Sequence, residues 1–423
     1  MTRIPIGLAA AAFALATVVG ATASPVRVLT AEEAVCIGSR DVTPQQLVAA
    51  CTAVIKSGSG PAVASAYNDR GIGYRLMGQE DLAIQDFDQA IRINPVNPEA
   101  YNNRGNAYRA KGQQDRAIQD YDEAIRLNPN YAVAYNGRAA AYSDKGQYDR
   151  AIKDLDESIR LSPAYAEAYV TRGNAYDQMG QQDRALKDYD AAIRVSPNDA
   201  DAYYDRGGVY RHLGQYDRAI QDYNQAIRLK PDDADSYDER GNAYDAKGEH
   251  DRAIQDFDEA IRLNPHEAAT YSNRGKAYFD VGQADRAIQD YDQAISLKPD
   301  YATAFYNRGL ALQSMSQYDR AIQDYDQAIR LKPDYATAYN NRGVIYLLKR
   351  QYERAVQDFN QVIRLTPDDA KTYTGRGICY ADMGEYDRAI QDYEAALRLK
   401  PDYALALRKL EDSRRAKAAV GSR

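Results

Sequence analysis

The chain lacks tryptophan and has little histidine, cysteine or phenylalanine. Its 423 residues include three His, three Cys and six Phe. The histidines, His212, His250 and His266, share no partner and none of the spacings that are typical of a metal site. A glycine-rich phosphate loop, a Ser/His/Asp set outside the repeat described below and an appended catalytic domain are also missing. We therefore expect no enzymatic activity, no metal and no cofactor.

A basic excess is missing as well. The chain has 54 Lys and Arg against 61 Asp and Glu, a net charge of −7. Binding to phosphates requires a basic face, so this balance argues against nucleic acid as the main partner.

Long apolar runs are absent except at the start of the chain. Residues 4–19 are apolar and rich in alanine, and they follow Arg3. Ala21 and Ala23 then fit the small-residue pattern of a cleavage site. A membrane anchor is disfavoured because a span needs about 20 apolar residues and a basic flank usually follows it. Residues 1–23 are thus predicted to be a signal peptide. The mature protein should be periplasmic or secreted, without insertion into a membrane.

Proline recurs at a fixed interval of 34 residues. It occupies positions 95, 129, 163, 197, 231, 265, 299, 333, 367 and 401. With each proline at place 32 of a unit, ten repeats cover residues 64–403, and the first begins at Ala64. A period of this length is typical of repeat architectures.

Six places are nearly constant across the ten repeats. Place 4 is Tyr or Phe, place 8 is Gly or Ala, place 11 is Tyr or Leu, and place 20 is always Ala. Place 24 is aromatic except for Leu155, and place 27 is usually Ala. This pattern resembles the tetratricopeptide repeat. It departs from that family in having Tyr in place of the usual Trp, and Arg in place of the usual Leu at place 7.

The resemblance implies an all-α fold, an α-solenoid that winds as a right-handed superhelix of ten helix–turn–helix units. The spacing of the constant places agrees with this fold. Places 4, 8 and 11 share one face of a first helix, and places 20, 24 and 27 share one face of a second. One such pair cannot bury its apolar face alone, whereas stacked pairs bury a continuous core. The tyrosines at the constant places are therefore interpreted as core residues.

Segments at both ends are predicted to cap the array. Residues 24–63 form an N-terminal cap, a degenerate helical pair with its second helix over residues 43–57, and residues 404–423 form a C-terminal capping helix and tail. Cys36 and Cys51 lie in the first cap. Because an exported chain meets an oxidising environment, we predict a disulfide between them, the alternative being two buried thiols. Cys379 falls at a small apolar place and is interpreted as a core residue.

Arg at place 7 and Asp at place 23 occur in all ten repeats. Repeat 1 keeps Asp86 although Leu82 replaces the arginine that other repeats have at place 19. This pairing predicts a partly buried Arg–Asp bridge between the two helices of each repeat. By contrast, Asp122 with Arg126 and Arg116 with Asp120 are interpreted as ordinary pairs on a helix surface.

A binding groove is implied by the resemblance, because first helices line the concave surface of such arrays. Places 2, 5, 6, 9, 12 and 13 should face inward, and unlike the framework places they vary. The candidate partner-binding residues are Asn102, Asn103, Asn106, Tyr204, Asp205, Asp235, Asp238, Glu239, Asn273, Phe279, Tyr306, Asn307 and Asn341. Asparagine at place 6 resembles the ladder with which some members hold a peptide backbone.

Charge at the inward places is concentrated in the middle of the array. These places sum to −1, −2, −1 and −4 in repeats 3 to 6 and to zero elsewhere. A concave acidic wall attracts ligands of opposite sign. The sequence therefore predicts a monomeric scaffold that binds an extended peptide or partner protein with a basic segment. The alternative is a structural spacer or a self-assembling component of the cell envelope that has no specific peptide ligand.

Overall fold

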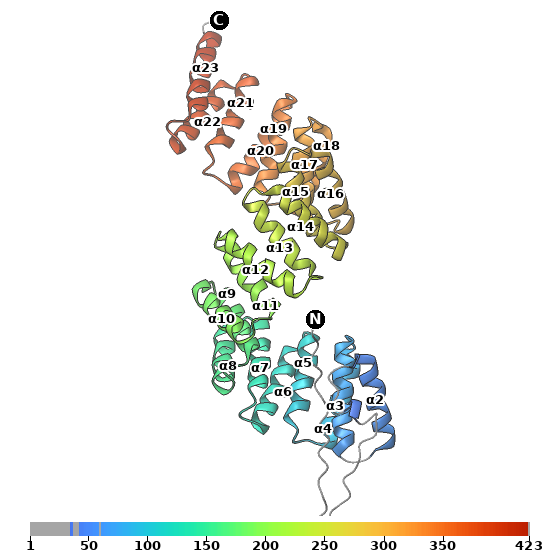
Figure 1. The fold of residues 1–423 in the computed structure, drawn as a ribbon. Coiled ribbons are helices and arrows are strands. Elements are labelled where there is room, and N and C mark those ends of the chain that lie inside the picture. Colours follow the sequence, from blue (N-terminus) through green and yellow to red (C-terminus); the bar gives the residue numbers. More distant parts are fainter. Residues whose placement is uncertain (1–33, 37–41, 59–60, 422–423) are drawn as a thin grey trace, which may run out of the picture. The chain divides into compact units, whose positions relative to one another are not determined.

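The structure is a computed structural model that describes residues 34–36, 42–58 and 61–421. The predicted signal peptide lies outside these residues. Helices are the only regular elements in the described part of the chain (Figure 1). Among the described residues no helix is both long and apolar enough to span a bilayer. The chain divides into two compact units, residues 1–150 and 151–423.

The helices of the first unit are α2 (Pro44–Ser57), α3 (Pro61–Leu76), α4 (Glu80–Ile93), α5 (Pro98–Ala110), α6 (Gln114–Leu127) and α7 (Ala132–Asp144). Helix α8 (Tyr148–Leu161) begins in this unit and continues in the second. The second unit contains α9 (Ala166–Gln178), α10 (Gln182–Val195), α11 (Ala200–His212), α12 (Tyr216–Leu229), α13 (Ala234–Ala246), α14 (His250–Leu263), α15 (Ala268–Asp280), α16 (Ala284–Leu297), α17 (Ala302–Ser314), α18 (Tyr318–Leu331), α19 (Ala336–Leu348), α20 (Tyr352–Leu365), α21 (Ala370–Asp382), α22 (Tyr386–Leu399) and α23 (Ala404–Gly421). The consecutive helical pairs confirm the predicted all-α solenoid architecture.

The turn between the two helices of a repeat depends on place 15. Gly248, for example, has a φ of 80°, and the next amide, that of Glu249, donates to the carbonyl of Tyr244 at 2.9 Å. Glycine reaches this left-handed region without the steric cost that a Cβ brings. Ser316 and Arg350 occupy the same place with φ values of 58° and 57°, so repeats 8 and 9 carry local backbone strain.

The core of each repeat is built where place 8 meets the ring at place 24. A Cβ added at Gly241 would lie 2.7 Å from the ring of Phe257, closer than van der Waals contact allows. Alanine at place 20, such as Ala253, is fully buried beside that ring. The small residues thus bring the two helices close enough to bury a large aromatic side chain.

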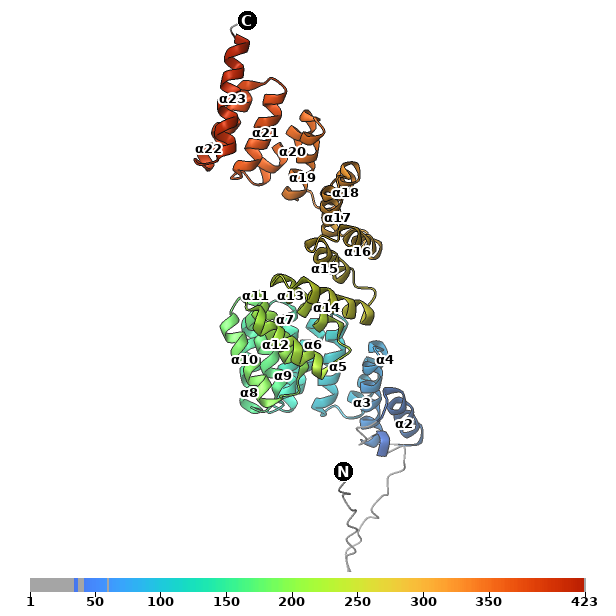
Figure 2. The ribbon, with the colours of Figure 1, turned by 45° about the horizontal axis from the view of Figure 1, so that its top comes forward.

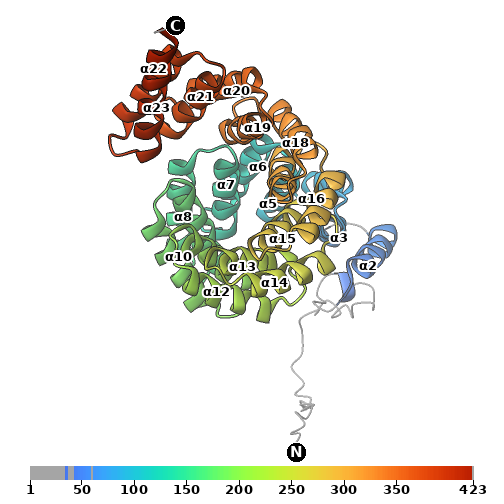
Figure 3. The same ribbon diagram turned by 90° about the horizontal axis from the view of Figure 1, so that it is seen from above.

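First helices of successive repeats contact one another in the second unit. Helix α11 contacts α13, and α13 contacts α15. Figure 3 shows α13 on the inner side of the bend formed by α12 to α15, with α12 and α14 on its outer side. The inner surface of this unit is therefore lined by first helices.

The two ends of the array are closed differently. At the first end, Thr43 caps α2 by accepting from the amide of Gln46, whose side chain accepts in turn from the amide of Thr43. At the other end α23 packs against α22 (Figure 2) and buries Ala406 and Leu410. Leu407, by contrast, is 46% exposed. The helical period places it away from the side of α23 that carries Ala406 and Leu410.

The predicted Arg–Asp bridges are seen in repeats 1, 2 and 4 to 10. In repeat 6 Arg240 donates from Nε and Nη2 to both carboxylate oxygens of Asp256, at 2.7 and 2.6 Å. The same bidentate pairing joins Arg70–Asp86, Arg104–Asp120, Arg172–Asp188, Arg206–Asp222, Arg274–Asp290, Arg308–Asp324, Arg342–Asp358 and Arg376–Asp392. These aspartates are all at least 91% buried, because the largest exposed side-chain fraction among them is 9%.

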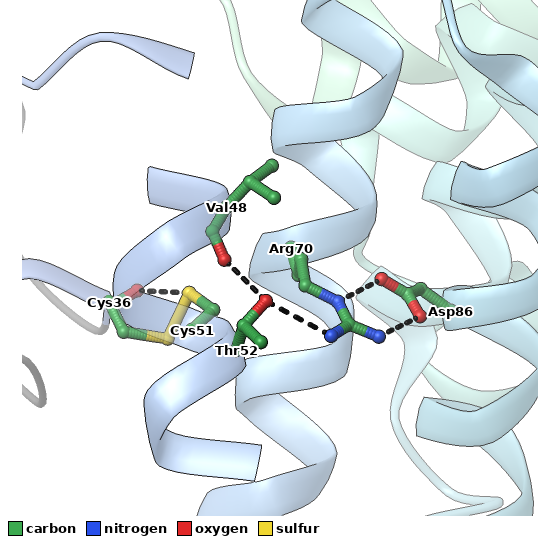
Figure 4. Close-up of polar contacts among 6 residues, drawn as sticks. All are labelled: Cys36, Val48, Cys51, Thr52, Arg70 and Asp86. Atoms are coloured by element: carbon green, nitrogen blue, oxygen red, sulfur yellow. Dashed lines mark hydrogen bonds and ion pairs between the residues drawn. A yellow bond between two sulfur atoms is a disulfide. The ribbon is translucent and has the colours of Figure 1, made fainter. Parts of the chain in front are cut away.

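The third guanidinium nitrogen extends each bridge to the preceding repeat, which the sequence did not reveal. Arg138 donates from Nη1 to Asp122 of the preceding repeat at 2.6 Å. The interpretation of Asp122 and Arg126 as a surface pair is therefore wrong, since Arg126 binds Glu123 instead. In repeat 1 the third nitrogen of Arg70 donates to Thr52 of α2 at 3.1 Å (Figure 4). We call each such arginine with its acceptors an arginine clamp.

The second surface pairing is also different from the prediction. Arg116 donates to Tyr108 Oη and to Gln113 Oε1, and its guanidinium lies 3.9 Å from the centroid of the Tyr108 ring. Asp120 is occupied by Arg104. A buried carboxylate pairs with the arginine that approaches from the facing helix, so spacing along one helix gave the wrong partner.

Candidate partner-binding groove

A cavity of about 330 Å³ opens between the first helices of repeats 4, 5 and 6. Three of the predicted groove residues, Tyr204, Asp205 and Glu239, lie in its wall. The other lining residues are Asn174, Asp177, Gln178, Tyr189, Gly208, Val209, Arg211, His212 and Tyr223. We call this cavity the acidic pocket. Helices α9, α11 and α13 supply its inward places, and the rings of α10 and α12 form its inner wall.

The carboxylates around the acidic pocket differ in whether they have a counter-ion. The Glu239 carboxylate lies 2.7 Å from Arg211 Nε, so this pair is neutral. No ion pair joins Asp205 to a cation in the described part of the chain. Burial raises the pKa of Asp205 to about 6, while the Asn174 side chain lowers it and the charges of Asp201 and Asp199 raise it further. The ionised form of Asp205 is therefore costly in the groove.

Asp238 is a second carboxylate of this kind. Burial raises its pKa to about 6. It accepts hydrogen bonds from Asn242 Nδ2 at 3.0 Å and from Asn273 Nδ2 at 3.4 Å, neither of which carries a charge. Asp235, one turn earlier on α13, is exposed. Together these residues leave a run of negative charge on the inner side of α11 and α13.

An aromatic surface lies further along the second unit, around Tyr306. The ring centroid of Tyr306 lies 4.8 Å from that of Tyr335 and 5.9 Å from that of Tyr325. Asn341 Nδ2 donates to Tyr306 Oη at 3.2 Å. The predicted residues Phe279 and Asn307 are half-buried, and Phe279 packs against the same core cluster as Tyr306.

The place-6 asparagines are used partly by the protein itself. Asn103, in the first unit, donates from Nδ2 to Asn68 Oδ1 of the preceding repeat at 3.0 Å. Asn273 and Asn341 donate to place 5 of the preceding repeat in the same way. Each amide keeps its carbonyl oxygen and a second N–H for other contacts. The asparagines at place 6 thus link successive repeats, and their remaining polar atoms face the groove.

Two other asparagines predicted for the groove have structural surroundings. Asn102 is only 3% exposed, so a partner cannot reach most of it. Asn106 Oδ1 accepts a hydrogen bond from the hydroxyl of the core residue Tyr121 at 2.7 Å. In the first unit the residue at place 5 therefore lies in the contact between repeats. The residue at place 9 forms a hydrogen bond with the aromatic side chain at place 24.

Sequence reasoning missed most residues of the acidic pocket, among them Asn174, Tyr189, Gly208 and Tyr223. The tyrosines occupy core place 24, so their position in the sequence does not reveal that they line a cavity. Gly208 did carry a signal. It is the only glycine at place 9 among the ten repeats.

A histidine assigned no partner by the sequence has one. His250 Nδ1 lies 2.8 Å from Asp245 Oδ1, and Asp280 is close enough to form a three-residue group with them. Lys276 Nζ lies 2.7 Å from Asp245 and 2.8 Å from Asp280. An internal ammonium therefore already pairs with both carboxylates.

The cysteines are arranged as a close pair and a buried single residue. The Cα atoms of Cys36 and Cys51 lie 4.9 Å apart with their sulfur atoms at bonding distance (Figure 4). Cys379 is fully buried, and burial raises the pKa of its thiol to about 12. A thiol in that state is a poor nucleophile.

Comparison with known proteins agrees with the repeat pattern. Models of the tetratricopeptide repeat match residues 170–234, 306–370 and 370–403, and a TPR repeat model matches residues 73–109, 105–146, 141–180, 241–282 and 275–316. No curated protein sequence matches the chain.

Solved structures with the same kind of repeat cover parts of the chain. MamA is 31% identical over 41% of this chain and 94% of its own, with a TM-score of 0.35. YrrB, described as a TPR protein with an unusual peptide-binding site, is 25% identical over 44% of this chain and 96% of its own, with a TM-score of 0.38. The APC/C assembly Cut9–Hcn1 is 14% identical over 88% of this chain and 93% of its own, with a TM-score of 0.47.

Proposed function

Because the chain belongs to the tetratricopeptide-repeat family, which is typically used for protein–protein interaction, we propose that it is a scaffold that binds an extended segment of a partner protein. The segment lies along the first helices of the second unit. It places a basic residue against repeats 4 to 6 and an apolar residue near Tyr306. The single observation that carries this proposal is the contrast between the arginine clamps and the groove. Asp205 and Asp238 are half-buried without a counter-ion.

The electrostatic argument follows from the cost of an unpaired charge. A half-buried carboxylate whose pKa is raised gains free energy when a cation approaches. The clamps show that this chain pairs the buried aspartates at place 23 with arginine. A basic partner residue would give Asp205 and Asp238 the positive charge that the clamp arginines give to the aspartates at place 23.

The test uses selection from a displayed library of random peptides on the full mature chain. The groove variant carries Asp205→Asn, Asp235→Asn, Asp238→Asn and Glu239→Gln, which keep shape and remove charge. The control variant carries Asp232→Asn, Asp251→Asn, Asp285→Asn and Asp300→Asn, four exposed residues outside the groove. We expect the parent and the control to select basic peptides that dissociate as salt rises, since exposed charge attraction is screened over about 8–10 Å.

Two outcomes would contradict the proposal. One is that the groove variant retains the selected peptides as tightly as the parent at low salt. The other is that the parent selects no peptide and instead forms large species in size analysis, as a spacer or a self-assembling component would.

Export is part of the proposal and rests on residues 1–23 and on the cysteine pair. An expressed full-length chain should yield a mature protein that begins at Ser24, with Cys36 and Cys51 oxidised. N-terminal sequencing of protein from an extracytoplasmic fraction would check this. Recovery only of the uncleaved chain from the cytoplasm would contradict it.

A further inference from the structure

Repeat 5 departs from its neighbours at place 9. Repeats 2 and 4 have Asn106 and Asn174 there, which accept from the core hydroxyls of Tyr121 and Tyr189 at 2.7 and 2.5 Å. Repeat 5 has Gly208, and the corresponding hydroxyl, that of Tyr223, lies near the Arg211 guanidinium but forms no hydrogen bond of standard geometry. Tyr223 is 0% exposed as a residue and its side chain lines the acidic pocket.

Neither packing nor backbone conformation requires glycine at position 208. The nearest atom to a Cβ built at Gly208 is Tyr223 Oη at 3.9 Å, an ordinary contact. The framework glycine Gly207, one residue earlier, would bring its Cβ within 2.9 Å of the same ring. Gly208 is also absent from the positive-φ glycines. Its effect is to leave space where repeats 4 and 6 carry an asparagine side chain.

The chemistry of that space suits a compact cation. Asp205 offers a carboxylate without a counter-ion, and Tyr223 offers a hydroxyl oxygen. The rings of Tyr204 and Tyr223, whose centroids are 5.9 Å apart, give apolar walls for a methylene chain. Arg211 is already paired with Glu239, so its charge does not cancel that of Asp205. The Tyr223 hydroxyl and the Asp205 carboxylate both line the pocket, and their oxygen atoms are two acceptors for one ammonium group.

We propose that the acidic pocket is a subsite for a lysine side chain of the bound segment, with its ammonium group between the Asp205 carboxylate and the Tyr223 hydroxyl. This inference rests on the proposed function and specifies the partner's chemistry at one position. Lysine is favoured over arginine because an ammonium is a compact point charge, whereas a guanidinium is a wide planar fork.

The decisive variant is Gly208→Asn, which gives repeat 5 the residue that repeats 4 and 6 carry. It fills the space and offers Tyr223 an acceptor, so the variant should fold at least as well as the parent. Ala140→Asn, the same change at place 9 of repeat 3, is the matched control. The probe is Nα-acetyl-lysine N-methylamide, compared with its norleucine and arginine analogues by ligand-observed NMR on the full mature chain at pH 7.5 and low salt.

We expect the lysine probe to bind the parent and the Ala140→Asn control at least tenfold more tightly than the norleucine probe. Gly208→Asn and Asp205→Asn should each abolish that preference. Equal binding of the lysine and norleucine probes by the parent would overturn the inference. So would an unchanged lysine preference in Gly208→Asn, or tighter binding of the arginine probe.

The two proposals can fail separately. If the library selection yields peptides that depend on the acidic groove but not on Gly208, the scaffold function stands and the lysine subsite is wrong. If the lysine probe shows the expected preference but no peptide is selected, the subsite stands and binding of an extended segment is wrong.

Discussion

The arginine clamps and the acidic pocket place carboxylates in opposite situations within the same repeats. Asp256, in a clamp, receives two hydrogen bonds from Arg240. Asp205, in the pocket, has no cation and a pKa raised by burial to about 6. The comparison teaches that burial of a carboxylate in this chain is not by itself a sign of stability. The framework satisfies its charges internally, whereas the groove leaves the charge of Asp205 without an internal counter-ion.

The largest expected effect comes from breaking a clamp. Arg240→Met should lower the free energy of unfolding by about 3–5 kcal/mol, because it leaves Asp256 buried without a partner. Arg252→Met is the matched control, since Arg252 is 65% exposed and binds only Glu249, and it should cost well under about 1 kcal/mol. Denaturant titration of both variants checks this. Equal, small losses would show that the clamps contribute little.

A covalent link should stabilise the first end of the framework. A disulfide between Cys36 and Cys51 closes a loop with a sequence separation of 15, which corresponds to about 3 kcal/mol on the chain-entropy model. Reduction should therefore expose α2 to proteolysis before the repeats. Intact mass with and without reduction, after alkylation, should show two protected thiols in the mature chain. Three free thiols in protein from an oxidising compartment would refute the bond.

Removing the unpaired charge of Asp205 should raise the free energy of unfolding, whereas breaking a clamp should lower it. Because its pKa is raised, Asp205 stays protonated in the folded chain at pH values where it has already ionised in the unfolded chain. The stability that this retained proton contributes is lost as pH rises through about 6. Asp205→Asn should therefore stabilise the chain by up to about 3 kcal/mol at pH 7.5 and by much less at pH 4.

Thermal unfolding at both pH values measures this difference, with Asp251→Asn as an exposed control. A destabilised Asp205→Asn variant at pH 7.5 would show that the carboxylate has an internal partner after all.

Binding of the lysine probe should depend on the same titration of Asp205, but its affinity should rise with pH where the stability falls. The ammonium needs the ionised carboxylate, so affinity should fall as pH drops through about 6. The charged groups around Asp205 are Asp177 on α9, Asp201 and Arg211 on α11 with Asp199 just before it, and Glu239 on α13, and His212 also lines the pocket. A positive charge on His212 would repel the ammonium, so the pH profile should be repeated in His212→Gln. A profile that disappears in that variant would assign the titration to the histidine.

The smallest expected effect lies within the framework. Arg350 adopts a left-handed conformation in which most repeats have glycine. Arg350→Gly should stabilise the chain by about 0.5–1 kcal/mol, because relief of the Cβ clash exceeds the added freedom of the unfolded chain. Gly248→Arg, the reciprocal change in repeat 6, should cost a similar amount. Chemical denaturation of both variants tests the pair, and a loss of stability in Arg350→Gly would contradict this account.

The sequence by itself determined the repeat, its period, the helical pairs and the bridge between Arg and Asp within a repeat. It could do so because each of these depends on residues that recur at fixed places, such as Gly241 beside Phe257. It also placed Tyr204, Asp205 and Glu239 on one inner surface, since inward places follow from helical period.

Only the tertiary structure decided which groups meet between repeats. The third nitrogen of the clamp arginine, the bond from Asn103 to Asn68 and the pairing of Arg211 with Glu239 all join different repeats. Spacing along one helix carries no information on these contacts, as the wrong assignment of Asp122 shows. The acidic pocket is the same kind of feature. Gly208 is visible in the sequence as an exception, but the space and the unpartnered Tyr223 hydroxyl exist only where α11 and α12 pack together, because a cavity is a property of packed side chains and not of any one of them.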